Sequence, residues 1–360
     1  MREKDFVAGK YSASVIDGKV TYKSPSNIAL VKYWGKKDNQ VPANPSVSFT
    51  LDSCATTTSL TYSKLEEPGK DFSFELLFEG KPKPDFKPKI QTFFTRISNY
   101  LPFLKSYHFV IETSNSFPHS SGIASSASGM SALALCLMYI ENQLDPAMEE
   151  DYFNAKASFL ARLGSGSAAR SIKGPIMQWG HHQDTEGSSD FYAINYPYKV
   201  HEVFNNYQDT ILLVDKGQKQ VSSTVGHNLM HGHPFAEQRF KQAHDNLSKL
   251  QRIFAEGDLP NFIKVVESEA LTLHAMMMSS LPYFMLMKPN TLEIINKIWE
   301  FRAESKSHLC FTLDAGANVH VLYPESEKDL VLQFIKDELV AYCENGQYLC
   351  DQIGNGAVEI

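Results

Sequence analysis

The chain has 360 residues, a length that suits two domains or one composite fold built around a cleft. Hydrophobic residues make up 43% and charged residues 21%, which is normal for a globular protein and excludes a disordered or fibrous chain. With 41 acidic and 34 basic residues the net charge is −7, so we expect no nucleic-acid partner, because general nucleic-acid binding needs a basic surface.

The first half of the chain is predicted to form strands and then helices. Apolar and polar residues alternate over residues 47–51 and again over residues 56–62, with a turn expected at Asp52 and Ser53 between the two runs. Further strands are expected over residues 72–78 and 107–113, and helices over residues 90–101 and 149–163. A Ser/Gly-rich loop at residues 115–128 precedes a strongly apolar helix.

The second half is predicted to begin after a polar stretch at residues 181–190. It contains a short buried strand at residues 210–215, helices over residues 234–256, 259–278 and 291–305, and two strands over residues 309–313 and 319–323. Ser326 is expected to cap a last helix. This order predicts an α+β protein of two halves, with domains at residues 1–187 and 188–360.

The cysteines and the first five residues indicate in which cellular compartment the protein is expected. The five cysteines are scattered and lack CxxC spacing, which indicates reduced thiols rather than a disulfide framework. Met1–Asp5 carries no apolar run, so no signal peptide is expected. No stretch approaches the roughly 18 apolar residues of a membrane span. We therefore expect a cytoplasmic protein with no membrane partner.

A loop of small residues, Phe117–Gly129, is the strongest chemical feature. It reads FPHSSGIASSASG and lies between a predicted strand and a predicted helix. Small residues let the backbone approach a phosphate closely, and the start of the helix offers unpaired N–H groups. The loop contains neither GxxxxGK[ST] nor GxGxxG, so a tight turn without a ligand is the alternative.

A second loop of small residues, Gly164–Ser171, repeats this pattern and adds an arginine. It reads GSGSAARS, and the guanidinium of Arg170 can pair bidentately with carboxylate or phosphate. The alternative is an exposed loop arginine. Two loops suited to anions favour a substrate with several negative charges.

A basic segment, Asn27–Asp38, reads NIALVKYWGKKD. Lys32 and Lys36 can act as point charges for phosphate oxygens, while Tyr33 offers a phenolic donor and Trp34 an apolar wall. The alternative is an edge strand with solvated lysines.

Near the carboxyl end, Asp314 lies in TLDAGANV, at a predicted strand end before a glycine turn. An aspartate in such a place is often only a turn former. The functional interpretation is a carboxylate that projects into a cleft and orients or deprotonates a hydroxyl.

These segments together resemble the diphosphomevalonate decarboxylase family of the GHMP kinase superfamily. The matching motifs are NIALVKYWGKKD, FPHSSGIASSASG, GSGSAARS, SSTVG and DAGAN, in that order. The resemblance implies a GHMP kinase fold, with an amino-terminal half like the second domain of ribosomal protein S5 and a ferredoxin-like carboxyl half. It implies that mevalonate 5-diphosphate and ATP, with Mg²⁺, give isopentenyl diphosphate, carbon dioxide, ADP and phosphate. We also expect a homodimer.

The resemblance implies a role for each motif residue. Asp314 would contact the substrate hydroxyl as base or orienting group, with Lys32 close by. Asn27 and Arg170 would hold the substrate carboxylate, and Ser126 would contact the transferred phosphoryl group and Mg²⁺. The expected substrate-binding residues are Tyr33, Trp34, Gly35, Lys36, Ser165, Gly166, Ser167, Ala168, Ala169, Arg170 and Thr224. The expected ATP-binding residues are Gly122, Ile123, Ala124, Ser125, Ser126, Ala127 and Ser128.

Two departures from the family pattern stand out. His119 and Ser120 occupy the first loop where the family often has threonine and alanine, and Lys89 or a neighbour replaces a family arginine. A kinase that phosphorylates a mevalonate-type 3-hydroxyl without decarboxylation is one alternative, and a phosphomevalonate decarboxylase is another. The combination of Lys32, Asp314 and Arg170 favours the decarboxylase.

A zinc enzyme is a more distant alternative. His227, His231 and His233 are close in sequence, and histidines at helical spacing can bind zinc. However, Gly232 and Pro234 interrupt a helix there, and HExxH is absent.

Overall fold

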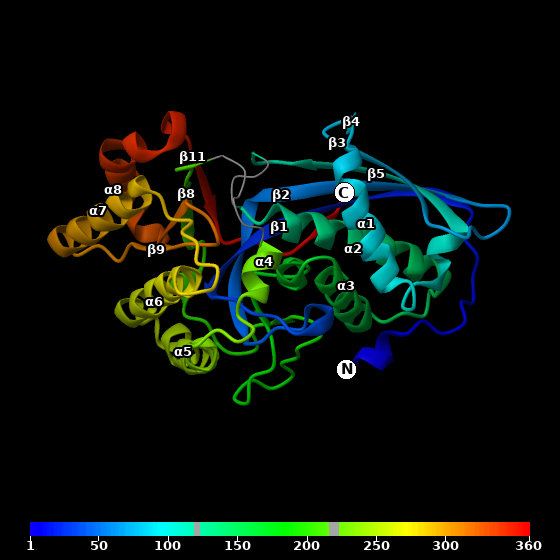
Figure 1. Ribbon diagram of the computed structural model, residues 1–360, viewed down its shortest axis with the longest axis horizontal. Coiled ribbons are helices and arrows are strands. Elements are labelled where there is room, and N and C mark those ends of the chain that lie inside the picture. Colours follow the sequence, from blue (N-terminus) through cyan, green and yellow to red (C-terminus); the bar gives the residue numbers. More distant parts are fainter. Residues whose placement is uncertain (119–122, 216–222) are drawn as a thin grey trace.

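The computed structural model describes residues 1–118, 123–215 and 223–360 (Figure 1). Within these ranges the strands form a larger sheet of eight strands and a smaller sheet of four. The strands are β1 (Asp17–Val31), β2 (Ser46–Lys64), β3 (Ser73–Phe78), β4 (Lys81–Pro82), β5 (Tyr107–Asn115), β6 (Ile176–Trp179), β7 (Ile194–Asn195), β8 (Gln208–Leu212), β9 (Cys310–Thr312), β10 (Val319–Tyr323), β11 (Tyr348–Gln352) and β12 (Val358–Glu359). The helices are α1 (Lys87–Ile97), α2 (Ser125–Leu144), α3 (Glu150–Gly164), α4 (Ser223–Asn228), α5 (Ala236–Glu256), α6 (Leu259–Met278), α7 (Pro289–Ser305) and α8 (Lys328–Phe334).

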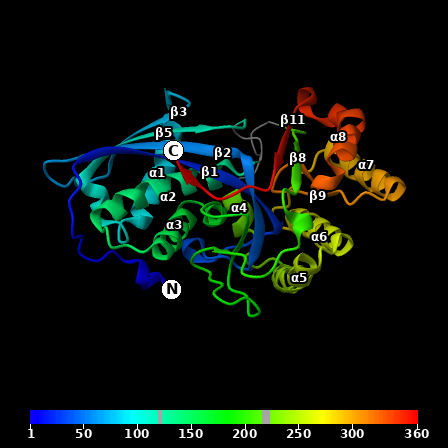
Figure 2. The same cartoon turned by 180° about the vertical axis from the view of Figure 1, so that it is seen from behind.

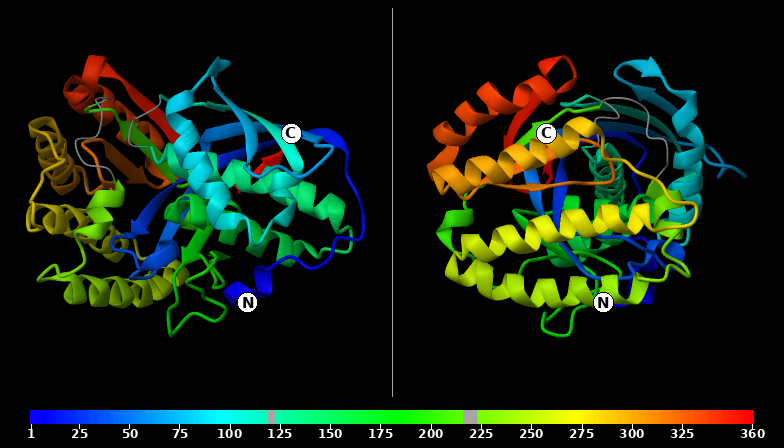
Figure 3. Two further views of the ribbon diagram at one scale, coloured as in Figure 1. Left: turned by 45° about the vertical axis from the view of Figure 1, so that its right-hand side comes forward. Right: turned by 60° about the vertical axis from the view of Figure 1, so that its left-hand side comes forward.

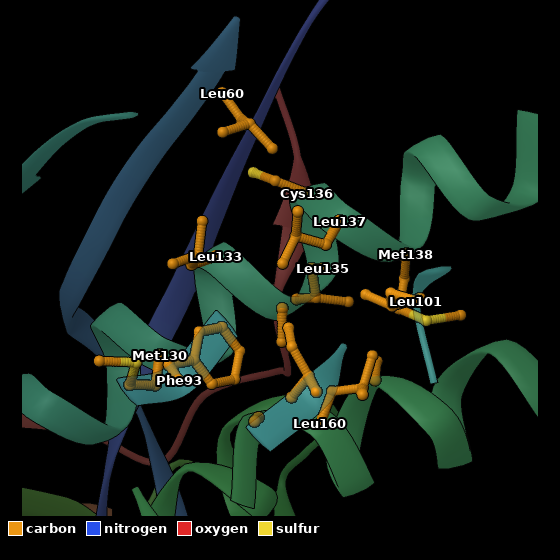
Figure 4. Packing of buried hydrophobic residues seen from close by; sticks show 14 of the residues in the cluster. Leu60, Phe93, Leu101, Met130, Leu133, Leu135, Cys136, Leu137, Met138 and Leu160 are labelled. Atoms are coloured by element: carbon orange, nitrogen blue, oxygen red, sulfur yellow. The ribbon is translucent and has the colours of Figure 1, made fainter. Parts of the chain in front are cut away.

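The larger sheet has the order β12-β1-β2-β5-β3-β4, and β6 joins β2 to β7 beside this path. Helices α1, α2 and α3 cover one of its faces (Figure 1). Apolar residues surround most of α2, so the helix is buried between the sheet and its neighbouring helices. Met130, Leu133 and Leu137 of α2 pack with Phe93 of α1 and Leu160 of α3 (Figure 4).

The smaller sheet has the order β11-β8-β10-β9 and carries helices on both faces (Figure 3). Successive strand residues point to opposite faces, so Leu212 packs with α7 and α8 while Ile211 packs with α5 and α6. The core on the α5–α6 side continues into the larger sheet through Ile28 and Phe49. The two halves therefore share one buried apolar core.

The carboxyl-terminal segment links the two sheets. It passes from β11 in the smaller sheet to β12, which pairs with β1 at the edge of the larger sheet (Figure 2). Strand β7 also pairs within the larger sheet. Strands β7 and β12, which follow the predicted domain boundary at residues 187–188 in the sequence, thus belong to the larger sheet together with the amino-terminal strands. The boundary itself stays a prediction.

The α+β class is confirmed, and two local predictions are wrong. Asp52 and Ser53 form no turn, since β2 runs through them and the carboxylate of Asp351 accepts their N–H groups at 3.0 and 2.8 Å. Ser326 caps no helix, because α8 begins at Lys328 without a side-chain cap. Across the described ranges, no helix combines the length and the apolar character that spanning a bilayer requires.

Candidate active site

Part of the residues singled out by the sequence meet at a cavity of about 330 Å³, where the amino-terminal and carboxyl-terminal halves come together. Its lining is Ala29, Lys32, Tyr33, Trp34, Lys36, Gln40, Lys89, Ala124, Ser126, Gly164, Ser165, Gly166, Ser167, Arg170, His227, Leu273, Asp314 and Ala315. The fold thus brings Lys32, Ser126, Arg170 and Asp314 to one place from four segments that are distant in the sequence.

Lys32 and Asp314 form an ion pair in this cavity. Lys32 directly follows β1 and is 1% exposed, so the alternative of a solvated lysine on an edge strand is wrong. Its Nζ donates to Oδ1 of Asp314 at 3.0 Å. Burial lowers the pKa of Lys32, while the negative charge of Asp314 opposes this shift. The pair places a carboxylate and a desolvated ammonium side by side.

A second ion pair holds the backbone of Lys32. Glu269 of α6 and Arg239 of α5 are fully buried, and Nη1 of Arg239 donates to Oε1 of Glu269 at 3.0 Å. Oε2 of Glu269 accepts from the Lys32 N–H at 2.9 Å, and Nη2 of Arg239 donates to the Lys32 carbonyl at 3.0 Å. Asn246 also donates to Glu269, at 2.7 Å. Both backbone groups of Lys32 are therefore fixed by one buried pair.

The backbone of Asp314 is held by His274 of α6. Nε2 of His274 donates to the carbonyl oxygen of Asp314 at 3.1 Å. Burial lowers the pKa of His274 to about 4, so the ring is neutral near pH 7 and keeps its proton on the donating nitrogen. Lys32 and Asp314 are thus both anchored from α6.

Arg170 is a buried cation that faces the cavity. Its Nε and Nη2 donate to Oδ1 of Asn27 at 3.3 Å, and its Nη1 donates to Ser46. Within the described part of the chain, no carboxylate forms an ion pair with it. Burial lowers the pKa of Arg170 to about 10, which leaves it charged at neutral pH. A buried guanidinium without a carboxylate partner is well suited to bind an anionic ligand.

Asn27 supports Arg170 rather than lining the cavity. Its Nδ2 donates to the carbonyl of Ser167 at 3.1 Å and to Oγ of Ser171 at 2.8 Å. With Oδ1 occupied by Arg170, its polar groups are all engaged within the protein. The expected direct contact between Asn27 and the substrate is therefore not visible in this geometry.

The second small-residue loop reaches the cavity only in part. Ser165, Gly166 and Ser167 line it, whereas Ala168 and Ala169 are buried in the core. A side chain at Gly166 would lie 2.8 Å from the hydroxyl of Tyr33, so only glycine permits this approach. Any contact of the two alanines with a ligand would have to come from their backbone.

The first small-residue loop also reaches the cavity only in part. Ser126 lies in the first turn of α2 and is exposed to the cavity, with its Oγ 3.3 Å from Oγ of Ser165. Ala127 is buried, and the Ser128 hydroxyl bonds Thr56 of β2 at 2.6 Å. Ile123 packs in the core, Ala124 lines the cavity, and Gly122 lies outside the described residues.

The basic segment presents Tyr33, Trp34 and Lys36 to the cavity. The Tyr33 hydroxyl is buried without a hydrogen-bond partner among the described residues, so a ligand could satisfy it. Gly35 has φ +97°, a conformation that favours glycine, and it directs its N–H toward His227. Thr224 belongs to α4, and its side chain is outside the described residues.

A second cavity of about 290 Å³ adjoins the first. It shares Ser126 and Lys89 with it and is otherwise lined mainly by apolar and threonine side chains of the larger sheet, α1 and α2. Lys89 therefore faces both cavities, and its replacement of a family arginine stays a prediction.

The histidines proposed for zinc do not converge. Nδ1 of His227 accepts from Gly35, Nε2 of His233 bonds the carbonyl of Met276 at 3.1 Å, and His231 is exposed. Over the residues that the structure describes, no group of three or more metal-binding side chains occurs. The zinc alternative therefore finds no site here.

Sequence reasoning missed the Arg239–Glu269 pair. A helical pattern could have revealed it, because Glu269 interrupts an apolar stripe between Val265 and Leu273. A charged residue in such a stripe needs a buried partner.

Comparisons with known proteins agree with this site. Residues 24–193 match a model of the diphosphomevalonate decarboxylase-like N-terminal domain, and residues 210–356 match the mevalonate 5-diphosphate decarboxylase C-terminal domain. Diphosphomevalonate decarboxylase of Candida albicans is 29% identical over 90% of this chain and 88% of its own length.

Solved structures show the same fold. Mevalonate diphosphate decarboxylase from Staphylococcus aureus superposes with a TM-score of 0.81 at 27% identity, covering 96% of this chain and 98% of that one. MDDEF in complex with MVAPP, AMPPCP and magnesium gives a TM-score of 0.80 at 26% identity, covering 95% and 98%. With both halves matched in order by family models, this chain belongs to the diphosphomevalonate decarboxylase family.

Proposed function

We propose that the protein catalyses the ATP-dependent decarboxylation of mevalonate 5-diphosphate to isopentenyl diphosphate, with release of carbon dioxide, ADP and phosphate. The observation that carries the proposal is the Lys32–Asp314 pair, which faces Arg170 across one cavity lined by both small-residue loops. A cationic pocket with one carboxylate suits a polyanionic substrate that must also have an alcohol activated.

Asp314 is proposed to contact the 3-hydroxyl of the substrate. The Nζ of Lys32 at 3.0 Å favours the ionised carboxylate, which can orient the hydroxyl and accept its proton during phosphoryl transfer. A tertiary hydroxyl is a poor leaving group, and phosphorylation converts it to a good one. Departure of that phosphate leaves electron deficiency beside the substrate carboxylate, and loss of carbon dioxide supplies the electrons of the new double bond.

The two anionic ends of the substrate are proposed to bind different cations. Arg170, fixed from behind by Asn27, is placed to hold the carboxylate close to Asp314. Lys36, the Tyr33 hydroxyl, which has no hydrogen-bond partner among the described residues, and the Ser165–Ser167 loop would hold the diphosphate. Fixing both ends would align the hydroxyl for in-line transfer.

ATP is proposed to place its nucleoside in the second cavity and its phosphates at Ser126 and Lys89, the residues shared by both cavities. The helix start at Ser125 adds N–H donors for phosphate oxygens. The described residues provide hydroxyls but no cluster of carboxylates, so Mg²⁺ would be held mainly by the phosphates, with Ser126 as a protein contact. When bound, the ion would neutralise phosphate charge.

The experiment supplies ATP, Mg²⁺ and mevalonate 5-diphosphate, and measures carbon dioxide, ADP and isopentenyl diphosphate in parallel. Equal amounts of all three support the proposal. ADP without carbon dioxide would identify a kinase, and preference for mevalonate 5-phosphate would identify a phosphomevalonate decarboxylase. No turnover of any of these substrates would overturn the proposal.

We further propose a cytoplasmic homodimer. All five cysteines are free thiols, which agrees with a reducing compartment. Between α6 and α7, Leu281, Tyr283 and Met285 are at least 70% exposed and offer an apolar surface for a second copy. Sedimentation of the wild type and of a triple serine variant of these positions would test the dimer.

A further inference from the structure

His227 lines the cavity but has no part in the function proposed above. It lies in the last turn of α4, a short helix at the centre of the molecule (Figure 1). At 8% exposure it is almost completely buried, so its polar nitrogens need partners in the protein or in a ligand.

The ring of His227 is held in one orientation by its neighbours. Its centroid lies 4.2 Å from that of Tyr33 and 4.6 Å from that of Trp34, so aromatic rings pack beside it. The preceding residue, Gly226, approaches Trp34 so closely that a Cβ atom there would lie 2.5 Å from the indole. The backbone of α4 is therefore pressed against the basic segment.

The hydrogen bond to Gly35 determines the tautomer of His227. The N–H of Gly35 donates to Nδ1 at 3.0 Å, so Nδ1 is unprotonated. Burial, together with the nearby positive charges of Lys36 and Arg170, lowers the pKa of His227 to about 3. The imidazole is consequently neutral at physiological pH, and its single proton is on Nε2.

These constraints leave one edge of the imidazole available. Tyr33 and Trp34 pack beside the ring and the backbone occupies Nδ1, whereas the residue still contributes to the cavity wall. Nε2–H is then a donor available to the cavity that Lys36 also lines, where the diphosphate is proposed to bind. A neutral donor adds a bond to an anion without adding a further charge to a cation-rich pocket.

We propose that His227 donates a hydrogen bond from Nε2–H to the diphosphate of the substrate and is a specificity-determining residue for that group. This inference rests on the proposed function, because it takes the diphosphate position from it.

Two substitutions separate a ligand contact from a structural role. In His227→Asn the amide oxygen can replace Nδ1 as acceptor for Gly35, but the donor at the Nε2 position is lost. In His227→Gln the longer amide can place an N–H near the Nε2 position, but the acceptor for Gly35 is lost. His231→Asn, at an exposed histidine outside the cavity, is the matched control.

Calorimetry with inorganic pyrophosphate and steady-state kinetics with mevalonate 5-diphosphate give the readouts. We expect His227→Asn to raise the pyrophosphate Kd and the KM about 10- to 100-fold, the range for losing a hydrogen bond to a charged group. His227→Gln should lose clearly less, the KM for ATP should stay near the wild-type value, and His231→Asn should match the wild type. If His227→Asn binds like the wild type, or His227→Gln is the more damaged of the two, His227 serves only Gly35 and the inference is wrong.

A measurement on the unmodified protein covers the case in which the variants do not fold. Nuclear magnetic resonance of isotope-labelled histidine should show Nε2 protonated in the free protein and its resonance shifted by pyrophosphate. A proton on Nδ1, or no shift at saturation, would overturn the inference. Pyrophosphate binding through His227 without carbon dioxide release from mevalonate 5-diphosphate would instead refute the proposed function alone.

Discussion

Replacing Glu269 by glutamine tests whether the buried pair with Arg239 positions Lys32. The Glu269 carboxylate accepts bonds from Arg239, Asn246 and the Lys32 N–H, and both members of the pair are fully buried. Glutamine has almost the same volume, but it removes the negative charge and replaces one acceptor by a donor. Arg239 would then be a buried cation without a counter-charge.

The expected cost follows from this burial. Breaking a buried ion pair by removing one partner costs about 3–5 kcal/mol, a large part of the roughly 5–15 kcal/mol that keeps a domain folded. Because the backbone of Lys32 loses an acceptor, its Nζ should move away from Asp314. A shift of about 1 Å at a catalytic group can lower kcat about 100-fold.

Glu141→Gln is the control for general damage to the core. Glu141 of α2 pairs with Lys156 of α3, the two side chains are at most 2% exposed, and neither lines the cavity. Urea unfolding should show a comparable loss of stability for Glu141→Gln and Glu269→Gln. Only Glu269→Gln should strongly lower kcat when both are assayed well below their transitions.

Two results would refute the reasoning. The free energy of unfolding of Glu269→Gln could lie within about 1 kcal/mol of the wild-type value, which would mean that the buried ion pair contributes no more to stability than an exposed ion pair. Alternatively, the two variants could lose kcat equally, which would mean that core damage rather than the position of Lys32 lowers activity.

Three further predictions concern single residues. Asp314→Ala should lower kcat at least about 100-fold while mevalonate 5-diphosphate still binds, and turnover within about tenfold of the wild type would remove Asp314 from the mechanism. Because the pKa of His274 is about 4 in the folded protein and 6.5 in the reference state, the unfolded chain binds the extra proton as pH falls from about 6.5 to 4. Stability should therefore fall across that window by at most about 1.4 kcal/mol per pH unit, and urea titrations of His274→Gln should show a flatter profile; an unchanged slope would contradict the assignment. Gly226→Ala should lose about 1–3 kcal/mol in urea unfolding, because its Cβ would lie 2.5 Å from Trp34, and wild-type stability would contradict this packing.

Elements with strong internal periodicity could be predicted from the sequence. The expected helix over residues 259–278 and strand over residues 319–323 match α6 and β10 at both ends. Their apolar spacing is local, so no distant residue is needed to define them.

Features that depend on distant partners could not be predicted in this way. Strand β2 continues through Asp52 because the carboxylate of Asp351, 299 residues further along the chain, accepts its N–H. Lys32 is held in the interior by the Arg239–Glu269 pair of α5 and α6. The sequence of residues 27–38 alone does not indicate this pair.

In the candidate site, too, some features could be predicted from the local sequence and others depend on distant residues. Composition and spacing left an interpretation without a ligand open for each loop. The prediction that the loops share one cavity came from the resemblance of the ordered motifs to a family. The structure brings Lys32, Ser126, Arg170 and Asp314 to that cavity, whereas Asn27 and Ser128 bond to other protein groups. The direction in which a loop side chain points depends on its packing, which a motif does not encode.

The closing of β12 on β1 has a consequence for synthesis. The hydroxyl of Tyr22 donates to Glu359 at 3.2 Å, although the two residues are 337 positions apart in the chain. On the ribosome, this part of the β1 edge stays unpaired until Val358 and Glu359 have been translated. The larger sheet is therefore completed only after the last strand of the smaller sheet has been made, and until then this strand edge is open to pairing with another chain.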